Sequence, residues 1–194
     1  MSALIKKNVT RKNINLINKN HPVYEPDKWN ANKYIKQTHN CYAYALNLID
    51  KKQANKCKQY IKTKKMRCPR PQPGEYSGYG HEFNLKKVTC KTIEKRMLKD
   101  NPFIKKLKKN QECPNGFYRI MLYIANDGSD YHFLRQDNTG LWSNKDGWKI
   151  ATNKDLKGRL IRYPHLADKG KYTVYCGDYA VPNKSKYKHT LTIF

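Results

Sequence analysis

The nine residues F-Y-R-I-M-L-Y-I-A, from 117 to 125, constrain the fold more than any other segment of the chain. Apolar side chains occupy both alternating sets of positions, so both faces of this segment must be covered, which predicts a central strand of a sheet. After the turn N-D-G-S, three further segments predict strands, and they are Y-H-F-L-R-Q, L-W-S-N-K-D-G-W-K-I and Y-T-V-Y-C-G-D-Y-A-V-P. The C-terminal half therefore predicts an antiparallel sheet.

The segment T-H-N-C-Y-A-Y-A-L-N-L-I-D, from 38 to 50, predicts a buried helix ahead of this sheet. Asn40 is a favourable N-cap residue, which places Cys41 at the first helical position. The run is apolar nearly all round, so we expect it to be buried. The basic stretch 51–67 is most simply explained as the solvated end of the same helix followed by a loop.

Two further segments complete the expected architecture. The stretch 68–80 contains three prolines and three glycines and should be irregular. Residues 89–108 predict one helix interrupted at Pro102, or two short helices. The chain is long enough for one well-buried core, so we expect a basic N-terminal arm over residues 1–30 and a single α+β domain over 31–194.

The charge of the chain is strongly one-sided. Forty Lys and Arg residues against fifteen Asp and Glu residues give a net charge of +25, and 32 of the 40 are Lys. Such a charge attracts polyanions such as nucleic acid or an anionic surface. Lys is a hydrated point charge and less suited than Arg to reading bases, which favours nonspecific attraction or plain solubility. A dedicated anionic partner and a merely charged surface both stay open.

The cysteines and the N-terminal segment indicate in which part of the cell the protein is expected. Six cysteines are scattered without a C-x-x-C pair, which predicts reduced thiols, a cytoplasmic protein and no structural metal site. No motif for a cofactor is present. The start M-S-A-L-I-K-K lacks the apolar region of a signal peptide, and no run is long enough to span a bilayer, so we expect no integral membrane association.

Cys41 and His132 are the candidate catalytic pair. A helix N-terminus favours the thiolate, and an imidazole carried by a strand of the sheet could act as its base. If Asn138-Thr139-Gly140 form a three-residue hairpin loop, His132 faces Asp146, with Asn144 one step away on the same side. Either residue could orient His132. We prefer Asn144 and keep Asp146 as the alternative, and Gln37 is a candidate oxyanion donor.

Two motifs carry a resemblance to a known family. N-C-Y-A-Y-A resembles the start of the catalytic helix in papain-like thiol hydrolases, particularly NlpC-type and CHAP amidases and peptidases. The segment D-Y-H-F-L-R-Q-D-N-T-G-L-W-S-N-K-D-G-W is similar to uncharacterised bacterial and large-DNA-virus proteins, which often have His in place of Asn144. The resemblance spans roughly 40–182 and implies a papain-like fold with a catalytic helix packed on the sheet.

Two functions of different classes follow from these observations. The first is a cysteine-type amide hydrolase, a thiol protease or amidase, that acts on a peptide or protein substrate through Cys41, His132 and Asn144. The second is a noncatalytic basic structural protein on a papain-like scaffold, for example a virion component that binds nucleic acid, membrane or capsid partners through its Lys-rich surface.

Overall fold

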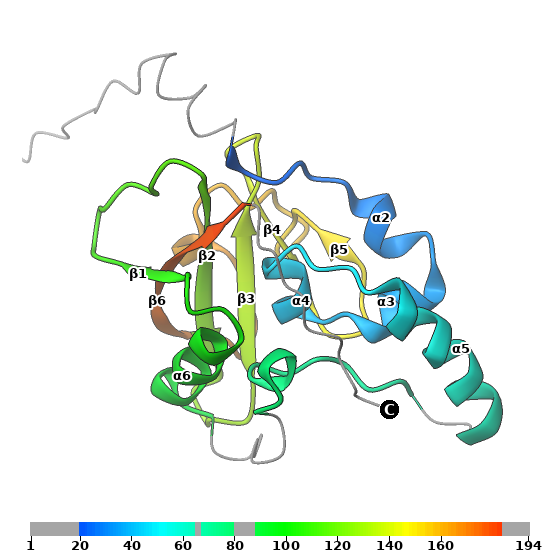
Figure 1. Ribbon diagram of the computed structural model, residues 1–194. Helices are drawn as coiled ribbons and strands as arrows, with labels where there is room; N and C mark the ends of the chain where they lie inside the picture. Colours follow the sequence, from blue (N-terminus) through cyan, green and yellow to red (C-terminus); the bar gives the residue numbers. More distant parts are fainter. Residues whose placement is uncertain (1–19, 65–66, 80–87, 184–194) are drawn as a thin grey trace, which may run out of the picture.

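A six-stranded antiparallel sheet with strand order β1-β6-β2-β3-β4-β5 forms the centre of the molecule (Figure 1). The computed structural model describes residues 20–64, 67–79 and 88–183. The strands are β1 (Lys105–Leu107), β2 (Phe117–Ile124), β3 (Tyr131–Gln136), β4 (Trp142–Lys145), β5 (Ala151–Thr152) and β6 (Val174–Pro182). The helices are α2 (Pro26–Asn30), α3 (Lys33–Thr38), α4 (Cys41–Ala45), α5 (Lys51–Lys64) and α6 (Cys90–Asp100), with short 3₁₀ turns η1 (Glu75–Ser77) and η3 (Pro164–Leu166).

The predicted central strand is confirmed. β2 lies between β6 and β3, and both of its faces are covered. Ile120 and Leu122 belong to the apolar cluster beneath the helices. Met121 and Tyr123 face the other way and pack with Ile161, which comes from the segment 153–173. The sheet is therefore a middle layer, with helices on one face and a long irregular segment on the other.

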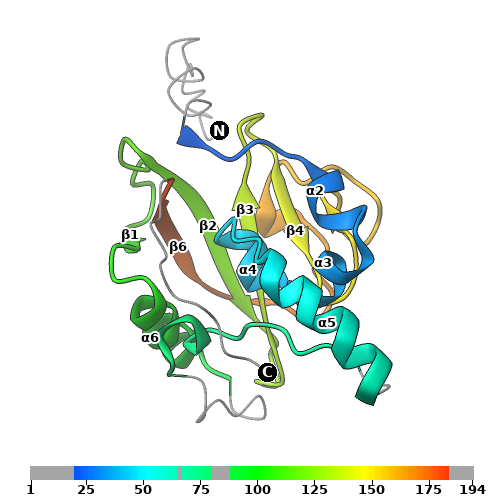
Figure 2. The same cartoon turned by 45° about the vertical axis from the view of Figure 1, so that its right-hand side comes forward.

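The predicted buried helix also packs on the sheet. Figure 2 shows α4 lying across β3. The ring centroid of Tyr42 lies 5.5 Å from that of Phe133 on β3. The Tyr42 hydroxyl donates to Asp100 Oδ2 at 2.6 Å, which joins α4 to the end of α6. The predicted α+β class, with an antiparallel sheet and a helix packed against it, is confirmed.

A bulge in β6 sets which residues of that strand face the helices. Leu122 pairs with Gly177 but Tyr123 pairs with Tyr175, so Cys176 is the extra residue. An extra residue reverses the alternation of side chains along a strand. As a result Cys176 and Tyr179, three positions apart, both contact the cluster under the helices. Cys176 can then reach Cys90 at the start of α6.

The predicted continuation of the buried helix into the basic stretch is wrong. α4 ends at Ala45, and Asn47 has a left-handed backbone with φ of 54°. A separate helix, α5, follows Asp50, whose carboxylate accepts from the backbone N–H groups of Lys52 and Gln53 at 2.8 and 3.1 Å. Asp50 acts as the N-cap, a start signal placed inside what the sequence analysis treated as one helix.

The region 89–108 is helical only in its first part. The Thr89 side chain caps α6 by accepting from the backbone N–H of Thr92. The helix ends at Asp100, just before Pro102. Residues 105–107 then pair with β6 as the edge strand β1, in which Lys105 and Lys106 are exposed and Leu107 is buried.

The N-terminal boundary of the domain lies earlier than residue 30. Trp29 is 2% exposed, and its ring centroid lies 4.9 Å from that of Tyr44. The Asn30 side chain donates to the carbonyl of Ala151 at 3.0 Å and accepts from its N–H at 2.7 Å. Residues 20–30 therefore belong to the packed domain, and the rest of the predicted arm, 1–19, lies outside the described residues.

Four of the six cysteines are paired, which corrects the prediction of reduced thiols. Cys57 in α5 is bonded to Cys68, and Cys90 in α6 is bonded to Cys176 in β6. Neither pair has a short recognisable spacing, since the separations are 11 and 86 residues. The expectation failed because it used chain size as a guide, whereas the Cys90–Cys176 pairing depends on the bulge in β6.

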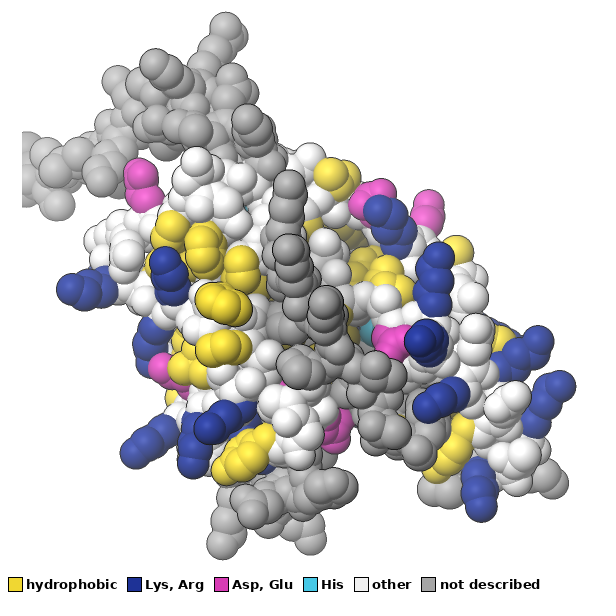
Figure 3. All heavy atoms as spheres, in the orientation of Figure 1, with side chains coloured by type: hydrophobic (Ala, Val, Ile, Leu, Met, Phe, Trp, Pro, Cys, Tyr) yellow, Lys and Arg dark blue, Asp and Glu magenta, His cyan; other side chains and the backbone are white. Residues whose placement is uncertain are grey.

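Basic side chains lie on both sides of the face shown in Figure 3 and are not gathered into one patch. This distribution is what the scattered Lys residues of the sequence lead one to expect. In the part of the chain that the structure describes, no helix combines the length and the apolar character needed to cross a bilayer.

Candidate functional site

The start of α4 has the predicted geometry. The Asn40 side-chain oxygen accepts from the backbone N–H groups of Tyr42 and Ala43, both at 3.1 Å. Its amide nitrogen donates to the carbonyl of Pro71 at 2.7 Å, which fixes the side chain. Asn40 is the N-cap and Cys41 is the first helical residue, as predicted from the sequence.

The Cys41 thiol is buried and neutral. Its side chain is 4% exposed, and Sγ lies 3.9 Å from the carbonyl oxygen of Tyr131, to which it donates. Burial raises the pKa of Cys41 to about 12. The site therefore holds a thiol near pH 7 instead of the thiolate that nucleophilic attack needs.

His132 and Asn144 lie together on neighbouring strands. The hairpin register pairs Leu134 with Asn144, and His132 Nε2 is 3.3 Å from Asn144 Oδ1. The His132 ring stacks on Tyr172 at a centroid distance of 4.8 Å. Burial lowers the pKa of His132, so the ring is neutral and can donate one N–H. The alternative orienting residue, Asp146, forms an ion pair with Lys149 at 2.8 Å.

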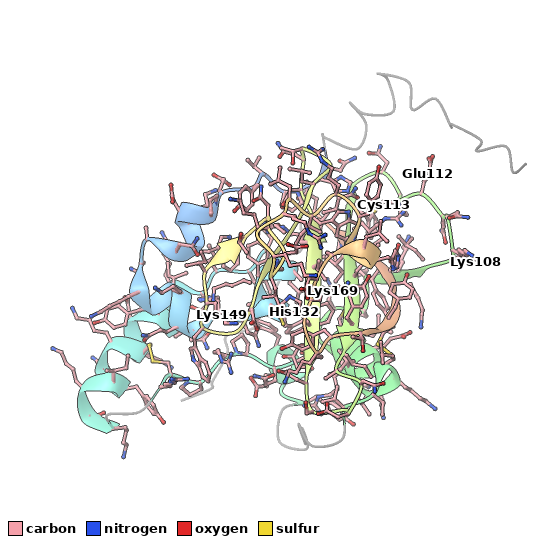
Figure 4. All side chains as sticks on the ribbon, turned by 180° about the vertical axis from the view of Figure 1, so that it is seen from behind. Lys108, Glu112, Cys113, His132, Lys149 and Lys169 are labelled. Atoms are coloured by element: carbon pink, nitrogen blue, oxygen red, sulfur yellow. A yellow bond between two sulfur atoms is a disulfide. The ribbon has the colours of Figure 1, made fainter. Side chains whose placement is uncertain are left out.

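Cys41 and His132 do not form a hydrogen bond. Cys41 packs with Tyr131 and Phe133 under the helices. His132 pairs with Tyr123, so it projects from the opposite face of the sheet. Figure 4 shows His132 on that side, near Lys149 and Lys169. Among the described residues, His132 Nδ1 is buried without a hydrogen-bond partner. The structure thus joins two of the three predicted residues and leaves the thiol apart.

A cleft of about 720 Å³ opens beside Cys41. Gln37, the predicted oxyanion donor, lines it together with Cys41. The Gln37 Oε1 atom is buried and has no hydrogen-bond partner within the described ranges. The other lining residues include Lys36, Arg67, Arg70, Asp130, Asp146, Trp148 and Lys149.

The role of the arginines in this cleft was not predicted from the sequence. The Cζ atoms of Arg67 and Arg70 lie 4.5 and 3.7 Å from the ring centroid of Trp148. These stacks join segments about 80 positions apart, and no local pattern signals them. The only hint in the sequence is that two of the eight Arg residues of a Lys-rich chain stand close together in the Pro-rich segment R-C-P-R-P.

A buried lysine supports the wall of the cleft. Lys145 is fully buried, and its ammonium donates to the carbonyls of Lys36, His39 and Gly147. Burial lowers the pKa of Lys145 to about 7. These bonds tie the end of β4 to α3, which fixes the loop that carries Trp148. In the ranges 20–64, 67–79 and 88–183 no group of His, Cys, Asp and Glu residues is arranged to hold a metal ion.

Comparison with known proteins overturns the predicted activity. Neither a protein-family model nor a solved structure matches the chain. The chain is 30% identical over 155 residues to Insoluble matrix shell protein 1 of Ruditapes philippinarum, and the match covers 79% of this chain and 86% of that protein.

That match contradicts three predictions. A protein of an insoluble shell matrix has a structural role, so the prediction of a cysteine-type amide hydrolase or thiol protease is wrong, in agreement with the neutral thiol of Cys41. The prediction of a virion component is also wrong. A shell lies outside cells, which contradicts the predicted cytoplasmic location, as do the two disulfides. The chain belongs to the family of Insoluble matrix shell protein 1.

Proposed function

We propose that this chain is a noncatalytic structural protein of an insoluble extracellular matrix. The observation that carries the proposal is the match to Insoluble matrix shell protein 1, which covers 86% of that protein. A match of this extent includes the folded core and not just one motif. The role of the relative is therefore the best guide to the role of this chain.

Two features of the structure support the proposal. The disulfides Cys57–Cys68 and Cys90–Cys176 suit an oxidising environment. The buried thiol of Cys41 has a pKa raised to about 12 and forms no hydrogen bond with His132, so this imidazole does not activate it. The basic surface would hold the protein to acidic components of such a matrix.

The finer description of the fold as papain-like is part of this proposal. It is supported by the order of the elements, since Asn40 and Cys41 begin a helix that packs on an antiparallel sheet, and His132 and Asn144 follow on β3 and β4. On this proposal the scaffold is retained while the thiol is not used. Superposition of a crystal structure of this chain on papain-like enzymes would test it, with α4 and strands β2 to β4 expected to coincide.

Fractionation of the source tissue tests the function. An antibody raised against the folded chain should detect it mainly in the extracellular residue that stays insoluble after detergent and salt extraction. Alkylation of the tissue before extraction should leave four cysteines unmodified, because they are disulfide-bonded. Recovery of the protein in the cell lysate with six alkylated thiols would contradict the proposal.

A further inference from the structure

The cleft beside Cys41 has the features of a binding site that the proposed function does not yet use. We propose that this cleft binds an anionic saccharide, meaning a sugar that carries carboxylate or sulfate groups, through Lys36, Arg67 and Arg70. The inference rests on the proposed function and deepens it, because it names the class of matrix component that the protein holds.

The two arginines are held in place, and their N–H groups form no hydrogen bond with any residue that the structure describes. Both guanidinium groups stack on Trp148, with Cζ to centroid distances of 4.5 Å for Arg67 and 3.7 Å for Arg70. Arg70 also lies against Gly147, where a Cβ would come within 2.6 Å of Arg70 Nη1. Stacking occupies the planar faces of a guanidinium and leaves its edge for bidentate bonds to carboxylate or sulfate.

The cleft has an excess of positive charge that the described residues do not neutralise. Among them, no carboxylate forms an ion pair with Lys36, Arg67 or Arg70. The two acidic residues that line the cleft already have partners. Asp146 pairs with Lys149 at 2.8 Å, and Asp130 pairs with Lys171 at 3.2 Å. An anionic ligand would supply the missing negative charge.

The remaining polar groups favour a saccharide over an acidic peptide. Asp130 and Asp146 line the cleft and present carboxylate oxygens as acceptors. Sugar hydroxyls can donate to both. A peptide of consecutive Asp or Glu residues would place carboxylates against Asp130 and Asp146, which costs affinity. The volume of about 720 Å³ lies within the usual range of ligand clefts, about 300–1,000 Å³.

Both walls of the cleft are fixed before any ligand arrives. The Cys57–Cys68 disulfide attaches the segment with Arg67 and Arg70 to α5. The Lys145 ammonium also donates to the carbonyl of Gly147 at 2.7 Å, next to the Trp148 ring on which both arginines stack. A preformed site loses less conformational entropy on binding than a flexible one.

Calorimetric titration of the oxidised full chain tests the site. The probes are a galacturonate trisaccharide, a sulfated galactose trisaccharide, a neutral galactose trisaccharide and hexa-aspartate. We expect binding of at least one anionic trisaccharide, none of the neutral one, and weaker binding of hexa-aspartate. The two anionic probes distinguish carboxylate from sulfate as the group recognised. In Arg67→Gln/Arg70→Gln we expect the affinity to fall at least about tenfold, because charge-assisted hydrogen bonds are lost.

A matched control removes the same charge elsewhere. Lys58→Gln/Lys62→Gln deletes two exposed positive charges from α5, outside the cleft, and should change the affinity less than about twofold. Circular dichroism checks that both variants fold. Equal losses in the two double variants, or tighter binding of hexa-aspartate, would overturn the site. If the tissue fractionation finds the protein inside cells but the trisaccharide binds as expected, the proposed function fails and the site stands.

Discussion

The state of Cys41 is decided by two opposing effects of different size. The start of a helix stabilises an anion by about 0.3–1 kcal/mol, which is less than one pKa unit. Burial acts in the other direction and raises the pKa of Cys41 to about 12. The helix is also only five residues long. Burial therefore outweighs the helix dipole, and the thiol stays protonated.

Alkylation of the folded protein should be slow at Cys41. With limiting iodoacetamide at pH 7, we expect the partly exposed Cys113 to react first and Cys41 to react only after denaturation. Burial raises the pKa of both thiols, to about 11 for Cys113 and about 12 for Cys41, and the sulfur of Cys41 is also covered. Peptide mass spectrometry would locate the label. Fast modification of Cys41 that is abolished by His132→Ala would show an activated nucleophile and contradict the assignment of a structural role.

A second buried residue gives the fold a dependence on pH. His39 is fully buried, and its Nε2 accepts from the backbone N–H of Asp50 at 2.9 Å. The opposite ring nitrogen, Nδ1, lies 2.9 Å from the carbonyl oxygen of Ile35 and donates to it. This pattern requires the neutral ring, and burial lowers the pKa of His39 to about 4.

Acid should therefore destabilise the protein through His39. His39 takes up a proton near pH 6.5 in the unfolded chain but only near pH 4 in the folded chain. The contribution of neutral His39 to stability is therefore complete above pH 6.5 and is lost as the pH falls to 4. The loss amounts to roughly 3 kcal/mol at 1.36 kcal/mol per pKa unit. Urea unfolding between pH 4 and 7 measures it. His39→Gln should flatten this part of the curve, and parallel curves for the two proteins would refute the prediction.

At the scale of elements, Lys145 connects three segments of the chain. Its ammonium bonds to the carbonyls of Lys36 at the end of α3, His39 before α4, and Gly147 after β4. Three carbonyls match the three N–H donors of an ammonium. The arrangement explains why a charged residue occupies a fully buried strand position.

Replacement of Lys145 by Met should destabilise the fold by about 2 kcal/mol or more, since three buried carbonyls lose their donor. This loss of stability should exceed the stability gained because the chain no longer has to bury a charged group. Urea unfolding at pH 6, where Lys145 with its pKa of about 7 is charged, measures the change in the free energy of unfolding. Lys58→Met on the exposed face of α5 is the control and should change stability by less than about 0.5 kcal/mol. A similar small change for Lys145→Met would contradict this role.

The elements that the sequence predicted well are those with local signals. Apolar side chains on both faces of 117–125 identify a central strand, and Asn40 marks the start of α4. The D-N-T-G turn fixes the hairpin register and so places His132 beside Asn144. The missed features are long-range contacts. Arg67 and Arg70 meet Trp148 through tertiary packing, and the cap at Asp50 was hidden inside an apparently continuous helix.

At the scale of the whole molecule, the net charge and the disulfides act against each other. A charge of +25 on 194 residues repels itself and favours expansion of the chain. The disulfides restrict the unfolded chain, and the effect grows with the length of the closed loop. The separations are 86 residues for Cys90–Cys176 and 11 residues for Cys57–Cys68, so the two disulfides should contribute differently to the stability of the fold.

Removal of the Cys90–Cys176 pair should cost more stability than removal of the Cys57–Cys68 pair. Loop-closure entropy gives about 4–5 kcal/mol for the longer loop and about 3 kcal/mol for the shorter one. Urea unfolding of Cys90→Ser/Cys176→Ser and Cys57→Ser/Cys68→Ser compares them. High salt screens the repulsion between positive charges, so it should reduce the difference in the free energy of unfolding between each variant and the parent. A larger loss for the shorter loop would contradict the entropic account.

The longer disulfide also changes what happens when the chain is cut. Cys90 and Cys176 enclose strands β1 to β5, so a protease that cleaves any one peptide bond between them leaves two fragments that are still covalently joined. Such a nicked molecule would keep its mass in a nonreducing gel and separate only after reduction. If the protein has the structural role proposed above, a single cut in its irregular segment 153–173 would leave it in the matrix as one covalently joined molecule.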